Sequence, residues 1–382
     1  MCGIVGYVGS KDAYPILIKG LHRLEYRGYD SAGIALINPA GKLNVYKSKG
    51  KVTELEHFVE DKDTSGTTGI AHTRWATHGE PNDVNAHPHY SENGSIALIH
   101  NGIIENYGVL KAMLAEKGYT FRSETDTEVL VQFIEYLHTE NRCTLFEAVQ
   151  AALNQVIGAY AIAVLDRTNN DEIIAARKSS PLVVGIGEGE YFLASDATPI
   201  VEYVKDVVYL NDGEIAVINR HKPLKVVNLN NIESKIDIRK LEMNISELEK
   251  GGYPHFMLKE IMEQPEALRR AITPRVKDGR IDFGDLILSR QTIESFNRIM
   301  IVACGSSYHV GMLGKYTIEK LTRIPVEAVL ASEFRYCDPI VDDRTLVIVI
   351  SQSGETLDTM AALREAKARG ARVLSIVNVV GS

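Results

Sequence analysis

The sequence predicts two domains of different fold class: an α+β domain with two packed sheets, then an α/β domain with a doubly wound parallel sheet. Three observations support this prediction. The chain has 382 residues, enough for two to three domains at about 150 residues each. Short apolar runs in two clusters, separated by helical segments, fill the first 240 residues, as expected for sheets under helical layers. After residue 298, continuous apolar strands alternate with helices, which is typical of a buried parallel sheet.

Composition narrows the class of protein further. Apolar residues make up 45% and charged residues 24%, which is ordinary globular usage. The net charge of −8 argues against nucleic acid as a partner. No apolar run approaches the roughly 18 residues of a membrane span, and no signal peptide is evident. The four cysteines form no CxxC pair, so neither a disulfide framework nor a zinc site is expected. We therefore expect a cytoplasmic protein that needs no metal and no cofactor.

The first domain is expected to span residues 2–240 as a four-layer αββα sandwich. The residue pattern predicts helices at 13–24, 107–117, 127–138 and 145–156. It predicts strands at 4–8, 32–37, 69–73, 96–100, 159–165, 172–177, 182–186 and 191–194. The Asp212-Gly213 pair lies between apolar runs at 207–210 and 214–218, and this pattern predicts a hairpin.

Residues 241–284 read as a polar, helical connector, and residues 285–382 as the second domain. Strands are expected at 299–303, 326–330, 346–350 and 373–377, with helices after the first and third of them. The sequence stops just past the fourth strand. We therefore expect this sheet domain to be truncated.

Cys2 is the first candidate for chemistry. Removal of Met1 would leave a thiol beside a free α-amine, whose ordinary pKa is near 7.7–8.0. That amine can take the thiol proton at neutral pH, so one residue can supply both nucleophile and base. The alternative is that Cys2 is an incidental small residue after the start codon.

Two further segments suggest a site. In residues 72–79, Arg74 can grip a carboxylate with both guanidinium nitrogens, or form a surface ion pair. Trp75, the only tryptophan, is either a core residue or part of a mobile lid. Asn101 and Gly102 follow an apolar strand. They form either an ordinary turn or an oxyanion hole, in which the Asn amide and the Gly N–H face a developing negative oxygen.

The pattern of residues 123–128 predicts a capping box that opens a helix, with Thr125 as the cap and Glu128 three residues on. Asp126 is then either a first-turn acid or a ligand for an ammonium group. His72, His78, His87 and His89 have no spacing typical of a metal site and are expected to be hydrogen-bonded or solvated.

Two hydroxyl-rich loops follow strands of the second domain and open helices. Such loops bind phosphate through hydroxyls and helix N–H groups without needing Lys or Arg. Neither loop has a dinucleotide or P-loop pattern. The loops are residues 304–307 (CGSS) and 351–356 (SQSGET).

At this point the chain resembles a known family. Residues 1–6 (MCGIVG), 24–33 (LEYRGYDSAG), 72–79 (HTRWATHG) and 100–102 (HNG) are similar to the class II glutamine amidotransferase domain, which has the N-terminal nucleophile fold. Residues 351–356 resemble a sugar isomerase (SIS) domain. The order of the two domains resembles the glutamine–fructose-6-phosphate aminotransferase family, along essentially the whole chain.

The resemblance implies roles for the residues. Cys2 would attack the side-chain amide of glutamine and form a thioester, with its own α-amine as base. The other catalytic residues would be Asn101 and Gly102, as the oxyanion hole, and Arg27, which would shape the site. Glutamine would be bound by Arg74, Thr77, His78 and Asp126, and Trp75 would gate an ammonia channel. Sugar phosphate would be bound by Ser306, Ser307, Ser351, Gln352, Ser353 and Thr356.

The resemblance also implies an activity. Glutamine would supply ammonia that aminates fructose 6-phosphate to glucosamine 6-phosphate. Members of the family continue into a second sugar isomerase domain, so this chain is expected to be competent only in glutamine hydrolysis, and the longer parent to be a homodimer. Two alternatives stay open. One is another class II amidotransferase with a phosphoribosyl or asparagine-forming partner domain; the other is a non-catalytic phosphosugar-binding regulator in which Cys2 is incidental.

Overall fold

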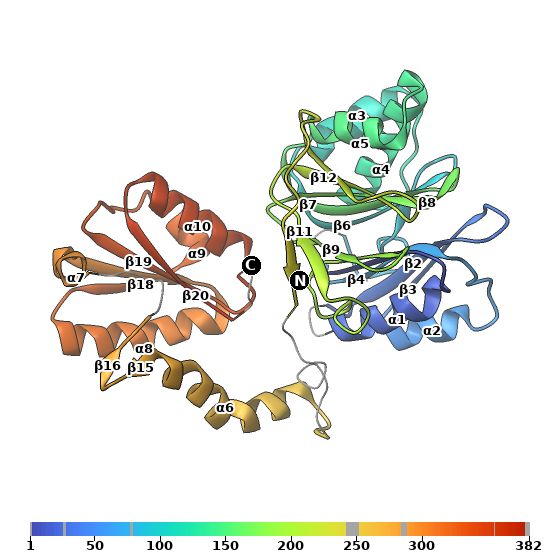
Figure 1. Cartoon of the computed structure of the whole chain (residues 1–382). Helices are drawn as coiled ribbons and strands as arrows, with labels where there is room; N and C mark the ends of the chain where they lie inside the picture. Colours follow the sequence, from blue (N-terminus) through green and yellow to red (C-terminus); the bar gives the residue numbers. More distant parts are fainter. Residues whose placement is uncertain are drawn as a thin grey trace. The chain divides into compact units, whose positions relative to one another are not determined.

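The computed structural model describes residues 2–25, 28–76, 79–241, 252–283, 289–354 and 356–378. The chain divides into two compact units, Met1–Leu248 and Glu249–Ser382. Each unit is described separately below, with elements labelled as in Figure 1.

The first unit contains two antiparallel sheets. The larger sheet has the strand order β14-β11-β9-β10-β1-β4-β2-β3. Its strands are β1 (Gly3–Val8), β2 (Ser31–Ile37), β3 (Leu43–Lys49), β4 (Thr68–Arg74), β9 (Val183–Ile186), β10 (Tyr191–Ala194), β11 (Asp206–Tyr209) and β14 (Ile238–Lys240). The smaller sheet has the order β13-β12-β8-β7-β6-β5. Its strands are β5 (His89–Tyr90), β6 (Ile96–Ile104), β7 (Gly158–Asp166), β8 (Asn169–Lys178), β12 (Glu214–Asn219) and β13 (Lys225–Asn228).

Helices cover the outer face of each sheet, which gives four layers (Figure 1). Beside the larger sheet lie α1 (Ala13–Leu24) and α2 (Val52–Val59). Beside the smaller sheet lie α3 (Tyr107–Glu116), α4 (Asp126–Asn141) and α5 (Leu145–Leu153). The predicted αββα architecture is confirmed.

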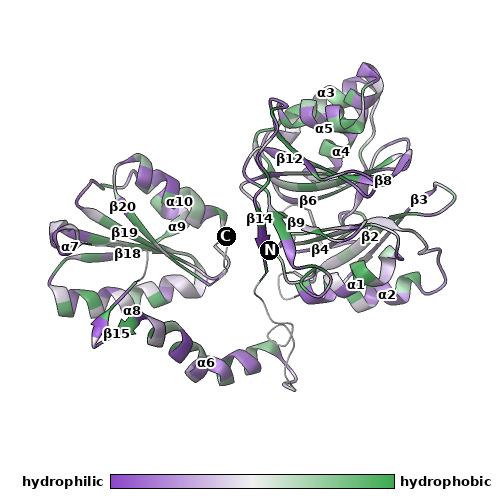
Figure 2. Ribbon diagram, viewed as in Figure 1, coloured by the Kyte–Doolittle hydropathy of each residue, from purple (hydrophilic) through white to green (hydrophobic). Residues whose placement is uncertain are grey.

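Three apolar clusters join these layers. Ile4 and Ile70 of the larger sheet pack with Ile99 of the smaller sheet in the central cluster. The other two clusters lie between each sheet and its helices, and Figure 2 shows the hydrophobic colouring concentrated in the strands. Successive side chains of a strand point to opposite faces of its sheet. The strands therefore contribute to the central cluster from one face and to a helix-covered cluster from the other.

One sequence prediction for this unit is wrong. The Asp212-Gly213 turn does not close a hairpin, because β11 pairs with β9 and β14 whereas β12 pairs with β8 and β13. The Gly213 N–H donates to the Arg177 carbonyl oxygen, 2.8 Å away, which fastens the turn to β8. The turn therefore passes the chain from one sheet to the other. A local turn signal does not distinguish these two outcomes.

The second unit contains a four-stranded sheet of order β18-β17-β19-β20, with every pair parallel. Its strands are β17 (Arg298–Ala303), β18 (Val326–Leu330), β19 (Thr345–Ser351) and β20 (Arg372–Val377). Its principal helices are α8 (Gly305–Thr322) and α10 (Leu357–Ala368), with short helices α7 (Arg290–Ser295) and α9 (Ala331–Phe334). Apolar clusters lie on both faces of the sheet. The predicted covered parallel sheet is confirmed.

Before this sheet the chain forms α6 (Phe256–Ile272), a 3₁₀ turn (Thr273–Arg275) and a small hairpin, β15 (Val276–Lys277) with β16 (Arg280–Ile281). Apolar and polar residues alternate in colour along α6 (Figure 2). Among the described residues, none of the helices combines the length and apolar character of a membrane span.

The core of the first unit generates a stability prediction. Phe133 of α4 is 1% exposed within the cluster under the smaller sheet. Phe133→Ala should lower the free energy of unfolding by about 3–5 kcal/mol through lost burial and a residual cavity. Glu140→Ala, at an exposed position of the same helix, should change it by less than about 0.5 kcal/mol. Denaturant unfolding of the two variants measures this, and equal effects would contradict the assigned core.

Candidate active site

The pairing of β1 with β4 positions Cys2. Gly3 lies opposite Thr73 in this register, so the residue before β1 meets the segment that follows β4. The backbone N–H of Trp75 donates to Cys2 Sγ at 3.3 Å, and the thiol donates to the Trp75 carbonyl oxygen at 3.6 Å. The thiol is therefore fixed by backbone groups, whichever way the Trp75 ring points.

The surroundings of Cys2 disfavour the thiolate at rest. Burial raises the pKa of the Cys2 thiol, and the N–H of Trp75 partly offsets this. The Asp30 carboxylate also raises this pKa. Asp30 has a structural role as well, because its Oδ2 accepts a hydrogen bond from the backbone N–H of Ala76. It thus ties the segment after β4 to the start of β2.

Strand β6 of the other sheet brings Asn101 and Gly102 to the same place. Asn101 Nδ2 donates to the Cys2 carbonyl oxygen at 3.2 Å. Gly102 has a φ of +134°, and a Cβ at this position would lie 2.1 Å from the Ala159 carbonyl oxygen. Only glycine fits this backbone path. The Asn101 amide thus contacts Cys2 directly, and Gly102 follows it along β6 on a backbone path that requires glycine.

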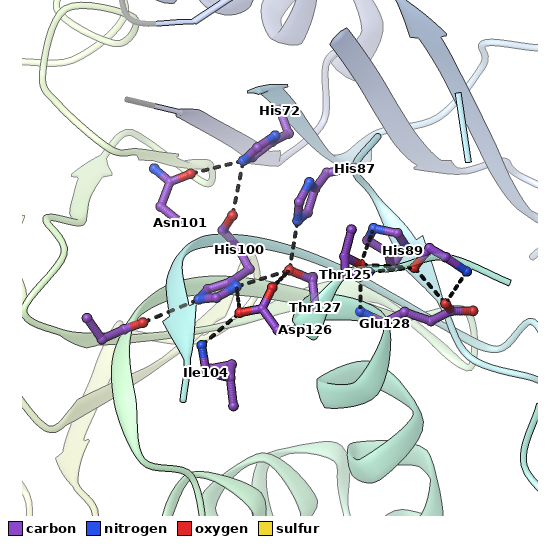
Figure 3. Close-up of polar contacts among 12 residues, drawn as sticks. His72, His87, His89, His100, Asn101, Ile104, Thr125, Asp126, Thr127 and Glu128 are labelled. Atoms are coloured by element: carbon purple, nitrogen blue, oxygen red, sulfur yellow. Dashed lines mark hydrogen bonds and ion pairs between the residues drawn. The ribbon is translucent and has the colours of Figure 1, made fainter. Parts of the chain in front are cut away.

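Behind Asn101 lies a buried histidine. His72 Nε2 is 2.9 Å from Asn101 Oδ1 and 3.2 Å from the His100 carbonyl oxygen (Figure 3). His87 packs against His72 with ring centroids 4.3 Å apart and the ring planes tilted by 34°. The His87 ring in turn contacts His89 edge-on at 4.9 Å.

The histidines of this cluster are held neutral. Burial lowers the pKa of His72 to about 3 and lowers those of His87 and His89 well below the usual value. Their polar partners are neutral: His87 Nε2 lies 2.9 Å from Thr127 Oγ1, and His89 Nε2 lies 3.0 Å from Thr125 Oγ1. Within the described ranges, no group of three or more His, Cys, Asp or Glu side chains is placed to hold a metal ion.

Asp126 is the first residue of α4, which Thr125 caps by accepting from the Glu128 N–H at 3.3 Å. Its Oδ2 accepts from the Ile104 N–H at 2.7 Å and lies 3.9 Å from His100 Nδ1 (Figure 3). The carboxylate therefore sits between the helix and β6, the strand of Asn101. The Thr125 cap and the inward-facing Asp126 carboxylate are therefore both present.

The predicted capping box of this helix is wrong in its second half. The Glu128 carboxylate accepts from the N–H groups of Arg122 and Ser123 and not from that of Thr125.

Arg74, the last residue of β4, is 4% exposed. Its guanidinium donates to the carbonyl oxygens of Gly79 and Glu80 at 3.3 and 3.4 Å. The Trp75 side chain is 50% exposed, so it is not a core residue. Its ring meets the exposed Tyr29 ring edge-on, with centroids 5.9 Å apart.

The predicted loop at residues 304–307 is instead the N-cap and first turn of α8, because the helix already begins at Gly305. This helix start and the segment that follows β19 lie at the same edge of the sheet, at the carboxyl ends of parallel strands. One residue separates β17 from α8, and five residues separate β19, the neighbouring parallel strand, from α10.

Thr359 Oγ1, in the first turn of α10, lies 3.9 Å from Sγ of Cys304, the N-cap of α8, so the starts of the two helices are close together. Ser351 Oγ accepts from the Gly354 N–H at 3.0 Å and lies 3.4 Å from Thr356 Oγ1.

The structure thus joins Cys2 directly to Trp75 and Asn101, and it joins Asp126 to the strand of Asn101. The predicted site residues Arg27, Thr77 and His78 lie outside the described residues. Asp30 and His72 were not selected from the sequence as site residues. Both lie in segments that carried the family resemblance, residues 24–33 and 72–79. Membership of those segments is the sequence signal that could have identified them.

Family models match both units. A glutamine amidotransferase domain matches residues 72–202, and a SIS domain matches residues 292–382. Among solved structures, glutamine phosphoribosylpyrophosphate amidotransferase from B. subtilis superposes with a TM-score of 0.53 at 22% identity, covering 99% of this chain and 81% of that one. At this identity the match concerns the fold alone.

Curated relatives match the whole chain. Proteins named glutamine–fructose-6-phosphate aminotransferase [isomerizing] are 63% identical in Bacteroides thetaiotaomicron, 52% in Chlorobaculum tepidum and 48% in Thermus thermophilus. The chain spans 62–63% of the length of these relatives.

Fold and site together define a glutamine amidotransferase domain of the N-terminal nucleophile type, followed by a sugar isomerase domain. The full-length matches then specify the family. The chain belongs to the glutamine–fructose-6-phosphate aminotransferase family.

The neutral histidine cluster generates a prediction about pH. An unfolded histidine binds a proton near pH 6.5, whereas folded His72, His87 and His89 resist protonation because their pKa values are lowered. The unfolded state therefore binds more protons below about pH 6.5, and stability should fall as the pH falls. Denaturant unfolding of the chain between pH 7.5 and 5.5 measures this slope.

The variant His89→Phe removes one of these buried imidazoles. It should reduce the pH slope of the unfolding free energy relative to the unsubstituted chain. An unchanged slope, or no slope between pH 6.5 and 5.5, would show that these histidines are not held neutral by the fold.

Proposed function

We propose that this chain hydrolyses L-glutamine to glutamate and ammonia through a thioester on Cys2. In the whole protein, the ammonia aminates fructose 6-phosphate to give glucosamine 6-phosphate. The observation that carries the proposal is the placement of Cys2, whose thiol is held by the Trp75 backbone and whose carbonyl accepts from Asn101 Nδ2.

The chemical step follows from these groups. Once Met1 is removed, the α-amine of Cys2 accepts the thiol proton, and the sulfur attacks the amide carbon of glutamine. The negative oxygen that forms is stabilised by Asn101 Nδ2 and the Gly102 N–H. The C–N bond then breaks, ammonia leaves with the transferred proton, and water hydrolyses the thioester to glutamate. The raised pKa of the buried thiol is the reason that a neighbouring base is needed.

Glutamine is held by charges of both signs. The Arg74 guanidinium, fixed by the carbonyls of Gly79 and Glu80, binds the α-carboxylate. We assign Thr77 and His78 to glutamine binding as well. Asp126 binds the α-ammonium group. We assign Arg27 to shaping the wall around Cys2, and Trp75, whose side chain is half exposed, to gating the exit of ammonia.

The sugar phosphate is assigned to the second unit. Two helices, α8 and α10, begin beyond the carboxyl ends of neighbouring parallel strands, where α/β sheets bind ligands. The free N–H groups of such helix starts favour a phosphate. The residues assigned to this site are Ser306, Ser307, Ser351, Gln352, Ser353 and Thr356.

Replacement of the nucleophile tests the proposal. Cys2→Ala should abolish release of glutamate and ammonia from L-glutamine, because no thioester can form. Cys337→Ala, at an exposed cysteine of the second unit, should leave the rate unchanged. Mass spectrometry first establishes that Met1 is absent from the purified chain. Full turnover by Cys2→Ala would rule out this mechanism.

Arg74→Lys tests glutamine recognition. Lysine keeps the charge but cannot make two parallel hydrogen bonds to a carboxylate. The variant should raise the KM for glutamine about tenfold, equivalent to about 1.4 kcal/mol, while kcat falls less. Steady-state glutaminase kinetics measure both constants. An unchanged KM would refute the assignment of Arg74 to the carboxylate.

A further inference from the structure

We propose that His72 is a positioning residue for glutamine hydrolysis: its Nε2–H holds the side-chain amide of Asn101 so that the NH₂ group faces Cys2. This inference rests on the proposed function, because it assigns the residue that orients the oxyanion hole. His72 lies on β4 of the larger sheet and Asn101 on β6 of the smaller sheet, so the contact crosses between the two sheets (Figure 3).

An oxyanion hole needs the correct face of the asparagine amide. The Oδ1 and Nδ2 atoms have nearly the same shape, so the amide can turn by 180° with little steric cost. In the turned orientation an oxygen would face the developing negative charge and would oppose the reaction. Something in the fold must therefore distinguish the two atoms.

Two backbone carbonyls make this distinction. The Cys2 carbonyl oxygen can only accept, so the amide atom 3.2 Å from it must be the nitrogen of Asn101. The His100 carbonyl oxygen can likewise only accept, so the ring nitrogen of His72 that lies 3.2 Å away must carry a hydrogen. That same Nε2–H faces Asn101 Oδ1 at 2.9 Å. The two constraints are independent and give one arrangement.

The ring of His72 is well placed to hold this arrangement. It is fully buried and packs against the tilted His87 ring, with centroids 4.3 Å apart. Its other nitrogen, Nδ1, is buried and has no hydrogen-bond partner among the described residues. The lowered pKa of His72, about 3 because of burial, keeps the ring neutral at working pH. A ring in this state donates from Nε2 but does not act as the general base.

A double-mutant cycle tests whether His72 acts through Asn101. His72→Phe keeps a ring of similar shape but removes the donor. It should lower glutaminase kcat by about 10- to 100-fold, with the KM for glutamine within about threefold. Asn101→Ala should lower kcat by about 10²–10³-fold, the usual loss for one oxyanion donor. The double variant should be no worse than Asn101→Ala alone, within about threefold.

Two further variants separate positioning from folding. His72→Gln retains an N–H donor and should recover part of the activity that His72→Phe loses. His89→Phe makes the same replacement in the same cluster at a histidine that contacts Thr125, and it should keep kcat within about threefold of the unsubstituted chain. The rate at which iodoacetamide alkylates Cys2 should be the same in His72→Phe as in the unsubstituted chain, because that reaction needs no oxyanion hole.

The outcomes distinguish this inference from the proposed function. If the unsubstituted chain, free of Met1, releases no ammonia from glutamine, the proposed function fails. If that chain is active but the losses of His72→Phe and Asn101→Ala multiply, or His72→Phe changes KM alone, only the positioning role fails. If His72→Gln or His89→Phe loses as much kcat as His72→Phe, the effect is structural and the inference is overturned.

Discussion

The register between β1 and β4 is the constraint on which the candidate site depends. Gly3 faces Thr73 across these two strands, and this pairing places the Cys2 thiol against the Trp75 backbone. A slip of one residue would turn every side chain of β1 to the opposite face. Ile4 would then leave the cluster between the sheets, so the same apolar packing that stabilises the sandwich also fixes the nucleophile.

The second constraint comes from the contact between the two sheets. Their shared interior is mostly apolar, and an unpaired polar group there would cost about 1–3 kcal/mol. In the polar cluster around His72 and Asn101, both ends of the Asn101 amide and His72 Nε2 are hydrogen-bonded internally, whereas Nδ1 of His72 and of His87 are buried without a partner among the described residues. The hydrogen bonds that are made hold Asn101 rigidly, since its partners come from other strands or from the start of β1. Oxyanion holes depend on such preorganised donors.

Much of this architecture could be predicted from local patterns. The helix expected at 13–24 is α1, because an apolar residue at every third or fourth position fixes one buried face. The alternation of strands and helices after residue 298 likewise predicts the parallel sheet. The same reasoning gave a wrong prediction of a hairpin at Asp212-Gly213. A local turn pattern does not specify which sheet the next strand joins.

The candidate site shows a similar limit. Cys2, Asn101 and Asp126 could be selected because their chemistry and sequence neighbours point to a reaction. His72 could not be selected as a positioning group, because its role depends on a bond between β4 and β6. Its burial and protonation state are also tertiary properties. Local sequence showed only a histidine near an arginine, which a surface or core position explains equally well.

Neutral histidines suit the proposed reaction for an electrostatic reason. A cationic imidazole near Cys2 would stabilise the thiolate, but it would also repel the ammonium group of glutamine that Asp126 is proposed to bind. A neutral ring donates a hydrogen bond to Asn101 without adding charge, and burial enforces that state. With the histidines neutral, the charges that we propose for the two ends of the glutamine backbone are those of Arg74 and Asp126. Recognition and oxyanion stabilisation are thereby assigned to different groups, and neither requires a proton to move on a histidine.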